Sequence, residues 1–288
     1  MLQQLFIKAS TYASKNTFKG AFTQTMHFNS HKPIPMEESL LKAVKEKNKP
    51  EVKYYLTKPI NLNHVSEELG SIFHAADSVV TRFFLKFPVN PNLLNTKGNA
   101  PLHDACNIGY YDKVERLLSH KDINPNIQNQ MGRTPLHYAT MLSNSRITEL
   151  LLSHKNIKPG ICDNFGNTAL HTALTAVNIE TILRDGRINP KAQNIFGETA
   201  LHEAVENGMI KLVEAFLKHD RSNNYMLINP SIKNLAGDTP IDIAFQEGYV
   251  EIAKLLASHP YHDKENAKSF REITELAKLA HDLDVGKR

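Results

Sequence analysis

Apolar residues recur along the chain in two alternating helical patterns. In the first pattern they stand three residues apart, as Leu136 and Ala139 do, which places them on one face of a short helix. The second pattern follows later and ends in paired apolar residues, as in ITELLL at 147–152. Glycine-containing polar segments precede the first pattern, and proline-containing segments follow the second. The alternation predicts pairs of short helices joined by turns.

The turn glycines set the register of a repeat. Aligned on its glycine, the pattern occurs five times, with steps of 34, 34, 31 and 40 residues. Asn or Asp stands three positions before each glycine, a spacing typical of a tight turn in which glycine takes a positive φ. A period in this range predicts a repeat architecture in which each unit packs on its neighbours. The glycines are Gly98, Gly132, Gly166, Gly197 and Gly237.

Each helix pair carries its own start and stop signals. Thr134 is expected to cap a first helix through its hydroxyl, and Pro135 suits the first helical position, where no N–H partner is needed. Gly109, Gly208 and Gly248 are expected to end first helices. Asn-Pro segments stop the second helix and extend the chain into the next turn. These signals predict two helices in every copy.

The combination resembles the ankyrin repeat. The Asn-x-x-Gly turn, the Thr-Pro-Leu-His phrase, a later glycine and the paired leucines occur together near that family's period of about 33 residues. The resemblance implies an all-α ankyrin-repeat solenoid of antiparallel helix pairs with β-turn fingers. Residues 36–263 would form this domain, with a cap at 37–56 and a shortened repeat at 70–85. Residues 1–35 are expected to be a flexible extension, and 264–288 a C-terminal capping helix and tail.

Histidine is abundant enough to suggest a metal site, with 14 residues in the chain. Equivalent positions of stacked helices, however, lie about 8–10 Å apart, too far to share one zinc ion at about 2 Å. We therefore expect no metal and no cofactor. One column of histidines should tie turns together by hydrogen bonds, and a second should meet the negative end of a helix dipole. The first column is His74, His103, His137, His171 and His202, and the second is His120, His154, His219 and His259.

Two short phrases resemble catalytic motifs but are explained by the repeat. HEAVE at 202–206 has Glu206 where His-Glu-x-x-His zinc proteases carry their second histidine. Cys106 follows His103 by three residues, yet it occupies the small inward position of the repeat and has no evident third partner. We expect no catalytic residue and no enzyme activity. An unrecognised enzyme built on the repeats is the alternative.

Charge and cysteine content narrow the choice of partner and compartment. The net charge of +4 comes from four lysines within residues 1–36, which contain no acidic residue, so the remainder of the chain is neutral. A neutral body argues against nucleic acid as a partner. No apolar run reaches the roughly 18 residues that a membrane span needs. The two cysteines indicate a reducing compartment, and we expect a cytoplasmic location.

The acid-free amino-terminal segment leaves other roles open. Targeting by this tail would make the chain an adaptor, and a mitochondrial presequence is disfavoured by the absence of arginine. The Asn- and Lys-rich phrases at 119–126 and 153–160 resemble ankyrin proteins of intracellular bacteria, which implies an effector delivered into the host cytoplasm. The longest step contains an insertion near 220–227, which we interpret as tolerated drift. A second contact site on Tyr225 and Met226 is the alternative.

The resemblance places the residue before each turn glycine at the tip of a finger, beside a concave surface. Polar residues are expected there, yet Met131, Phe165 and Phe196 occupy three successive tips. An exposed apolar stripe indicates a protein-binding site; the alternative is that each side chain lies on the neighbouring finger. The expected partner is another protein, and the chain alone is expected to be monomeric. The expected contact set is Met131, Arg133, Met141, Leu142, Phe165, Asn167, Ile195, Phe196, Glu198 and Leu235.

The residues near the ends of the first helices change in character along the chain. They run from apolar at Met141 and Leu142, through Thr175 and Ala176, to acidic at Glu206. An apolar partner segment flanked by basic residues would complement that order.

Overall fold

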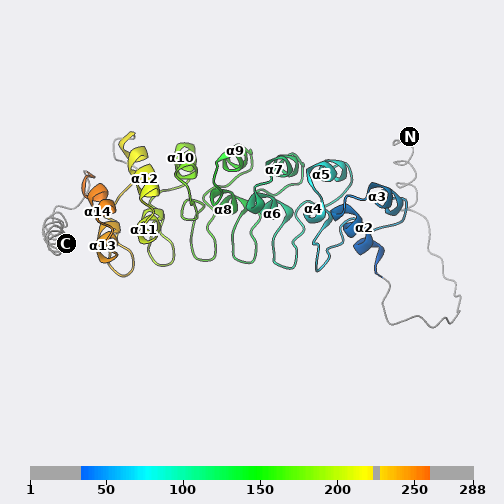
Figure 1. Cartoon of the computed structure of the whole chain (residues 1–288), viewed down its shortest axis with the longest axis horizontal. Coiled ribbons are helices and arrows are strands. Elements are labelled where there is room, and N and C mark those ends of the chain that lie inside the picture. Colours follow the sequence, from blue (N-terminus) through cyan, green and yellow to red (C-terminus); the bar gives the residue numbers. More distant parts are fainter. Residues whose placement is uncertain (1–33, 223–227, 260–288) are drawn as a thin grey trace, which may run out of the picture. The chain divides into compact units, whose positions relative to one another are not determined.

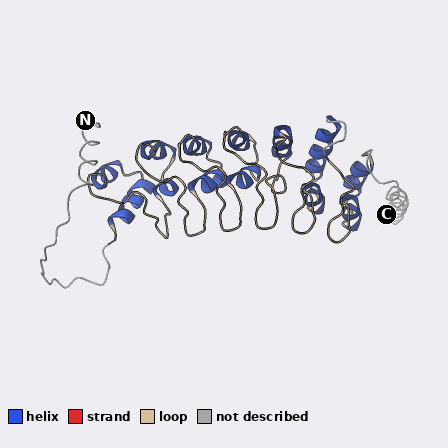
Figure 2. Cartoon of the chain, turned by 180° about the vertical axis from the view of Figure 1, so that it is seen from behind, coloured by secondary structure: helices blue, strands red, loops and turns tan. Residues whose placement is uncertain are grey.

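The computed structural model describes residues 34–222 and 228–259, which form helices connected by turns (Figure 1). No strand occurs within those two ranges (Figure 2). The chain divides into two units, which are described separately below. The helices are α2 (Met36–Lys45), α3 (Lys49–Tyr55), α4 (Ile72–Ala75), α5 (Ser78–Phe84), α6 (Pro101–Ile108), α7 (Tyr111–Leu118), α8 (Pro135–Thr140), α9 (Arg146–Leu152), α10 (Ala176–Asp185), α11 (Ala200–Glu206), α12 (Ile210–Ser222), α13 (Pro240–Gln246) and α14 (Val250–Ala257).

Unit 1 contains helices α2 to α5 and consists of the described residues up to Pro101 together with Ser119–Ile123. Helix α2 packs against both α3 and α4. Only two residues separate α4 from α5, and the second of them, Asp77, caps α5 by accepting a hydrogen bond of 2.9 Å from the Val80 N–H. The helix pair predicted at 37–56 and the shortened repeat predicted at 70–85 are therefore confirmed.

Unit 2 repeats the same arrangement in Leu102–Leu118 and in its described residues from Asn124 onward. In Figure 1 finger loops line the lower side, first helices such as α8 and α11 form the middle row, and second helices such as α9 and α12 form the upper row. Second helices pack on second helices, as α10 packs on both α9 and α12. First helices pack on first helices where α11 meets α13.

The two apolar columns of the sequence form the core of unit 2. The first column consists of Leu102, Leu136, Leu170, Leu201 and Ile241; each of these side chains is at most 2% exposed, including Leu170, which lies in a turn. The second-helix column consists of Leu117, Leu151, Ile182, Phe216 and Leu256, and each of these is at most 1% exposed. Full burial of one such side chain contributes about 1.5–3 kcal/mol. Apolar burial between neighbouring repeats therefore holds the stack together.

One prediction about the helices was wrong. Residues 168–175 contain a turn at 169–172 where the repeat pattern predicts a first helix, and no helix lies between α9 and α10 in the chain. The step from Gly166 to Gly197 is 31 residues, three shorter than the two steps before it, so too little chain remains for a helix and its turn. Thr175 is therefore no concave-face contact on a first helix: it caps α10 by accepting a hydrogen bond of 3.3 Å from the Asn178 N–H.

Asn178 takes over part of what the missing helix would do. Its side chain is fully buried, and its Nδ2 donates to the carbonyl of Thr140 at 3.1 Å and to that of Leu142 at 2.8 Å. Its Oδ1 accepts from the Thr148 hydroxyl at 2.7 Å. Buried carbonyls without a partner are costly. The amide of Asn178 thus satisfies carbonyls at the end of α8.

Some predicted features lie beyond the described residues. Apart from residues 34 and 35, the predicted extension and the whole of the predicted helix at 264–288 fall outside them. Tyr225 and Met226 of the insertion also fall outside them.

Candidate functional site

The finger tips are built by an asparagine or aspartate that folds the turn onto its own side chain. Asn129 Oδ1 accepts hydrogen bonds of 3.0 Å from the N–H groups of Met131 and Arg133, and the Gly132 N–H donates to the Asn129 carbonyl at 2.9 Å. Asp163 and Asn194 make the same contacts in the next two fingers. Each turn glycine has a positive φ, as predicted.

Neighbouring fingers are joined through the backbone of their tips. The Asn164 N–H donates to the Met131 carbonyl at 3.0 Å, and the Ile195 and Leu235 N–H groups donate at 2.9 Å to the next two tip carbonyls. Gly132 is required here for a second reason. A Cβ at this position would lie 2.7 Å from the Asn164 nitrogen, which is closer than a side chain tolerates. The tip backbone is therefore fixed on both sides.

The apolar side chains at these tips are exposed to solvent. We call Met131, Phe165, Ile195, Phe196 and Leu235 the tip stripe; their exposed fractions are 47%, 43%, 54%, 54% and 79%. Each of the five keeps at least 43% of its surface exposed, so none is fully covered by the neighbouring finger. Large apolar groups that remain exposed on a rigid backbone are typical of interaction surfaces.

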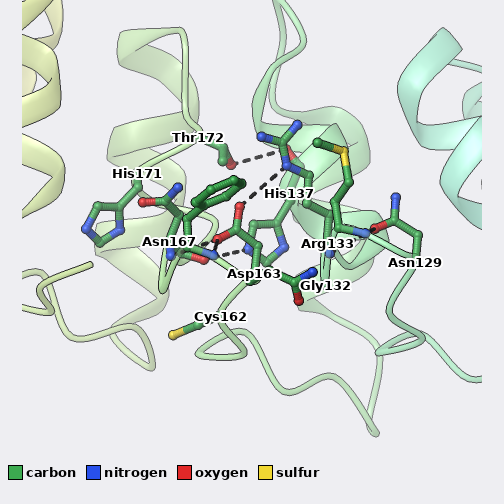
Figure 3. Close-up of polar contacts among 12 residues, drawn as sticks. Asn129, Gly132, Arg133, His137, Cys162, Asp163, Asn167, His171 and Thr172 are labelled. Atoms are coloured by element: carbon green, nitrogen blue, oxygen red, sulfur yellow. Dashed lines mark hydrogen bonds and ion pairs between the residues drawn. The ribbon is translucent and has the colours of Figure 1, made fainter. Parts of the chain in front are cut away.

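The first histidine column links each first helix to the next finger. His137 Nδ1 accepts from the Thr134 N–H at 3.1 Å, and its Nε2 lies 2.9 Å from the Asn167 carbonyl (Figure 3). The bond at Nδ1 requires a lone pair there, so Nε2 carries the proton and donates. His74, His103 and His171 place Nε2 on the equivalent carbonyl of their own following finger, at 2.9, 2.9 and 3.2 Å. The predicted structural role of this column is confirmed.

His202 is the exception in that column. Its Nδ1 makes the usual bond to the Thr199 N–H at 3.1 Å, but its buried Nε2 makes no well-aligned hydrogen bond. The backbone of Asp238, equivalent to Asn167, nonetheless raises its pKa against the larger lowering effect of burial. His202 and Asp238 are separated by the longest repeat, the 40-residue step from Gly197 to Gly237, which contains the insertion.

Burial keeps these imidazoles neutral. It lowers the pKa of His137, His171 and His202, and the hydrogen bonds to backbone carbonyls only partly oppose this effect. A neutral ring supplies the one acceptor and one donor that the contacts require.

Charge is distributed unevenly beside the tip stripe. Arg133 lies on the finger of Met131, where its Nε is 3.5 Å from the buried Asp163 carboxylate (Figure 3). Two repeats further on, Asn194 Nδ2 donates to Glu198 Oε2 at 3.1 Å and to Glu203 Oε1 at 3.3 Å. Burial, together with the nearby Glu198 carboxylate, raises the pKa of Glu203 to about 7. The charges beside the tip stripe are therefore paired near Met131, where Arg133 meets Asp163, and acidic near Phe196, where Glu198 and Glu203 lie.

The remaining members of the predicted contact set differ in availability. Met141 is 38% exposed at the end of α8, and Leu142 beside it is half-buried. Asn167 is used internally, because its carbonyl holds His137 and its Oδ1 accepts from Asn194 Nδ2 at 3.1 Å. Asn167 therefore stabilises the finger, and its oxygen atoms are already used by contacts within the chain.

The second histidine column has contacts that the helix-dipole argument did not specify. His120 Nδ1 accepts from the Asp122 N–H at 3.1 Å, and His154 Nδ1 accepts from the Asn156 N–H at 3.2 Å. His259 instead lies 2.6 Å from Asp220, with both side chains buried.

A row of asparagines in the connections was missed by sequence reasoning. Asn92 Nδ2 donates to the Asp122 carbonyl at 2.7 Å, and Asn126 Nδ2 donates to the Asn156 carbonyl at 2.7 Å. Asn126 Oδ1 also accepts from the Lys158 N–H at 2.7 Å. The available signal was the second asparagine of the Asn-Pro-Asn phrases.

Neither metal nor nucleophile chemistry finds support in the described residues. No group of three or more His, Cys, Asp or Glu side chains in residues 34–222 and 228–259 could hold a metal ion. Cys106 is fully buried, and burial raises the pKa of its thiol, the opposite of what a nucleophile needs.

None of the helices in the described part of the chain combines the length and apolar character that crossing a membrane requires.

Comparison with known proteins agrees with this geometry. A family model described as ankyrin repeats (3 copies) matches residues 107–187 and 179–268. The crystal structure of the ankyrin repeat domain of Bcl-3, a unique member of the IkappaB protein family, is similar with a TM-score of 0.64 and 23% identity, covering 75% of this chain and 96% of that one. EF0377, an ankyrin repeat protein, has a TM-score of 0.56 and 25% identity, covering 77% and 98% of the two chains. No curated protein sequence matches. With more than half of its residues matched by the family model, this chain belongs to the ankyrin-repeat family.

Proposed function

We propose that this chain is a non-catalytic binding protein that captures a partner protein through the tip stripe and the adjoining first-helix ends. Ankyrin repeats are generally protein–protein interaction modules and typically non-enzymatic. The observation that carries the proposal is the tip stripe itself, five exposed apolar side chains on fingers whose backbones are bonded to one another.

Rigidity is the physical reason that this surface suits binding. Ordering a flexible loop would cost free energy on association, whereas the fingers here are fixed before a partner arrives. Aromatic side chains and methionine are enriched at interface centres, and a few such residues carry most of the binding energy. Phe165 and Phe196 are the expected anchors.

The test uses the full chain and a displayed library of random 12-residue peptides. Peptides are selected on the wild-type chain and compared with those retained by the variant Phe165→Ser/Phe196→Ser. We expect the variant to lose at least tenfold in affinity for the selected peptides, because each anchor contributes more than about 1 kcal/mol. Its thermal unfolding should change little, since both side chains are about half exposed.

The matched control removes two exposed apolar side chains elsewhere. Tyr54 and Val79, 57% and 68% exposed, lie on α3 and α5 of unit 1. Tyr54→Ser/Val79→Ser should leave peptide affinity unchanged. Equal retention of peptides by both double variants would contradict the proposed site.

Location and delivery belong to the same proposal. Cys106 and Cys162 are both free thiols, and Cys162 is exposed, which supports a reducing compartment such as the cytoplasm. A role as a delivered effector or targeted adaptor would depend on residues 1–35. Deleting them and following the location of the chain in cells tests that role.

A further inference from the structure

We propose that the partner segment bound along the tip stripe carries a basic residue beside its apolar anchor, and that this cation lies between Glu198 and Glu203. The inference rests on the proposed function and names the chemistry of the partner. It commits to a protein segment with a large apolar side chain followed by lysine or arginine.

The apolar and acidic parts of the surface are organised by one side chain. Asn194 Oδ1 accepts from the Phe196 N–H at 2.9 Å and from the Glu198 N–H at 3.0 Å, which fixes the tip. Its Nδ2 faces the carboxylates of Glu198 and Glu203. The Phe196 tip and both carboxylates therefore lie around one amide. A single short peptide could contact all of them.

The amide that holds the two carboxylates is shared among more acceptors than it has N–H bonds. An asparagine amide carries two N–H bonds, yet Asn194 Nδ2 lies within 3.1–3.3 Å of three acceptors, namely Asn167 Oδ1, Glu198 Oε2 and Glu203 Oε1. Neither glutamate forms an ion pair with any residue in the described part of the chain. An ammonium or guanidinium group from a partner would donate to these carboxylates directly.

The surrounding charges give the surface a direction. Besides burial and the charge of Glu198, Glu206 on α11 and Asp163 on the preceding finger both raise the pKa of Glu203 through their negative charge. Arg133, the cation beside Met131, is already paired with Asp163. A partner should therefore place its apolar residues along Met131 and Phe165 and its cation at the acidic end.

Proton uptake at Glu203 competes with the cation. Since burial and Glu198 raise the pKa of Glu203 to about 7, this carboxyl is largely protonated at pH 6 and largely charged at pH 8. A cation binds the charged form, so binding should weaken as the pH falls. The affinity should fall by at most about tenfold between pH 8 and pH 6, because the charged fraction of a group with a pKa near 7 falls by that factor.

The experiment uses synthetic copies of the library-selected peptides, free of histidine, and measures their affinity by fluorescence anisotropy. Each basic residue is replaced by norleucine, which keeps the chain length and removes the charge. We expect the replacement to weaken binding to the wild-type chain at least tenfold at pH 8. It should have little effect on binding to Glu198→Gln/Glu203→Gln, as a double-mutant cycle requires for groups in contact. The same variant should lose the pH dependence.

The control variant Glu115→Gln/Glu214→Gln removes two exposed carboxylates from α7 and α12. It should behave as the wild type. Peptides that depend on Phe165 and Phe196 but carry no basic residue, or that lose equal affinity in both glutamine variants, would overturn the inference and leave the proposed function standing. A library that yields no tip-dependent peptide would overturn both.

Discussion

The Nε2 atom of His137 donates a hydrogen bond to the carbonyl of Asn167 across 2.9 Å, and this bond joins a first helix to the finger of the next repeat. His202 occupies the same position of this column two repeats further along, with the same bond to its threonine but without a well-aligned hydrogen bond at Nε2. The two residues form a natural comparison, because they differ in the inter-repeat bond alone among the contacts described for this column.

We predict that His137→Ala destabilises the chain by about 2–3 kcal/mol and His202→Ala by about 1 kcal/mol less, since a buried hydrogen bond contributes about that amount. Urea unfolding followed by circular dichroism measures both. Equal losses would show that the bond to Asn167 contributes nothing beyond the helix cap.

Stability should fall as the pH drops below about 6.5, the ordinary histidine value. Burial lowers the pKa of His137, His171 and His202 in the folded chain, so below that pH the unfolded chain takes up protons that the folded chain does not. Stability rises with pH wherever the unfolded state binds more protons. Thermal unfolding between pH 5 and pH 8 should therefore show a lower Tm on the acid side. The difference should shrink in His137→Gln, whose side chain does not titrate.

Glu203 makes the opposite contribution. Its pKa is about 7 in the folded chain against an ordinary value of 4.5, so between these values the folded state holds a proton that the unfolded state has lost. Above pH 7 the folded chain carries a partly buried negative charge on Glu203, which lowers its stability. We predict that Glu203→Gln raises stability at pH 8 by about 1 kcal/mol, after allowance for solvent screening. At pH 4.5 it should have little effect. The same gain at both pH values would exclude charge as the cause.

Sequence reasoning succeeded where the cause is local and periodic. The Asn-x-x-Gly turns and the two apolar columns each depend on residues a few positions apart, and both appear in the structure as expected. The predicted cap differs in detail, because the Thr134 hydroxyl lies 2.8 Å from His137 Nδ1 and makes no side-chain cap hydrogen bond. The missing helix at 168–175 escaped notice because Thr168 to Ala173 keep the repeat phrase. The helix is absent because this repeat is three residues shorter. The shortening alone does not reveal this, because the outcome depends on how the chain packs against Thr140 and Asn178.

The acidic site escaped notice for a related reason. Glu198 lies in a finger and Glu203 in α11, and a spacing of five residues gives no reason to expect them to share a donor. They meet because the finger folds onto Asn194, a residue that the pattern had assigned only to the turn. Such a site is formed by contacts between structural elements, and the pattern within one element does not predict them.

The row of asparagines in the connections offers a stabilising substitution. Asn92 and Asn126 each donate to a carbonyl of the following connection at 2.7 Å, and Gly160 stands at the next position of that row. A Cβ at Gly160 would meet nothing within 4 Å, and its φ is not in the positive range. Gly160→Asn should therefore form the missing bond, with the Arg187 carbonyl as acceptor, because Arg187 precedes Ile188 as Asp122 precedes Ile123.

We predict that Gly160→Asn raises the free energy of unfolding by about 1–2 kcal/mol. About half should come from the lower entropy of the unfolded chain when glycine is replaced, and the remainder from the hydrogen bond. Gly160→Ala separates the two, since it retains the entropic part alone and should be stabilised less than the asparagine variant. Urea unfolding of the three chains measures the difference. If alanine and asparagine stabilise equally, the connection after Gly160 does not present its carbonyl as the earlier connections do.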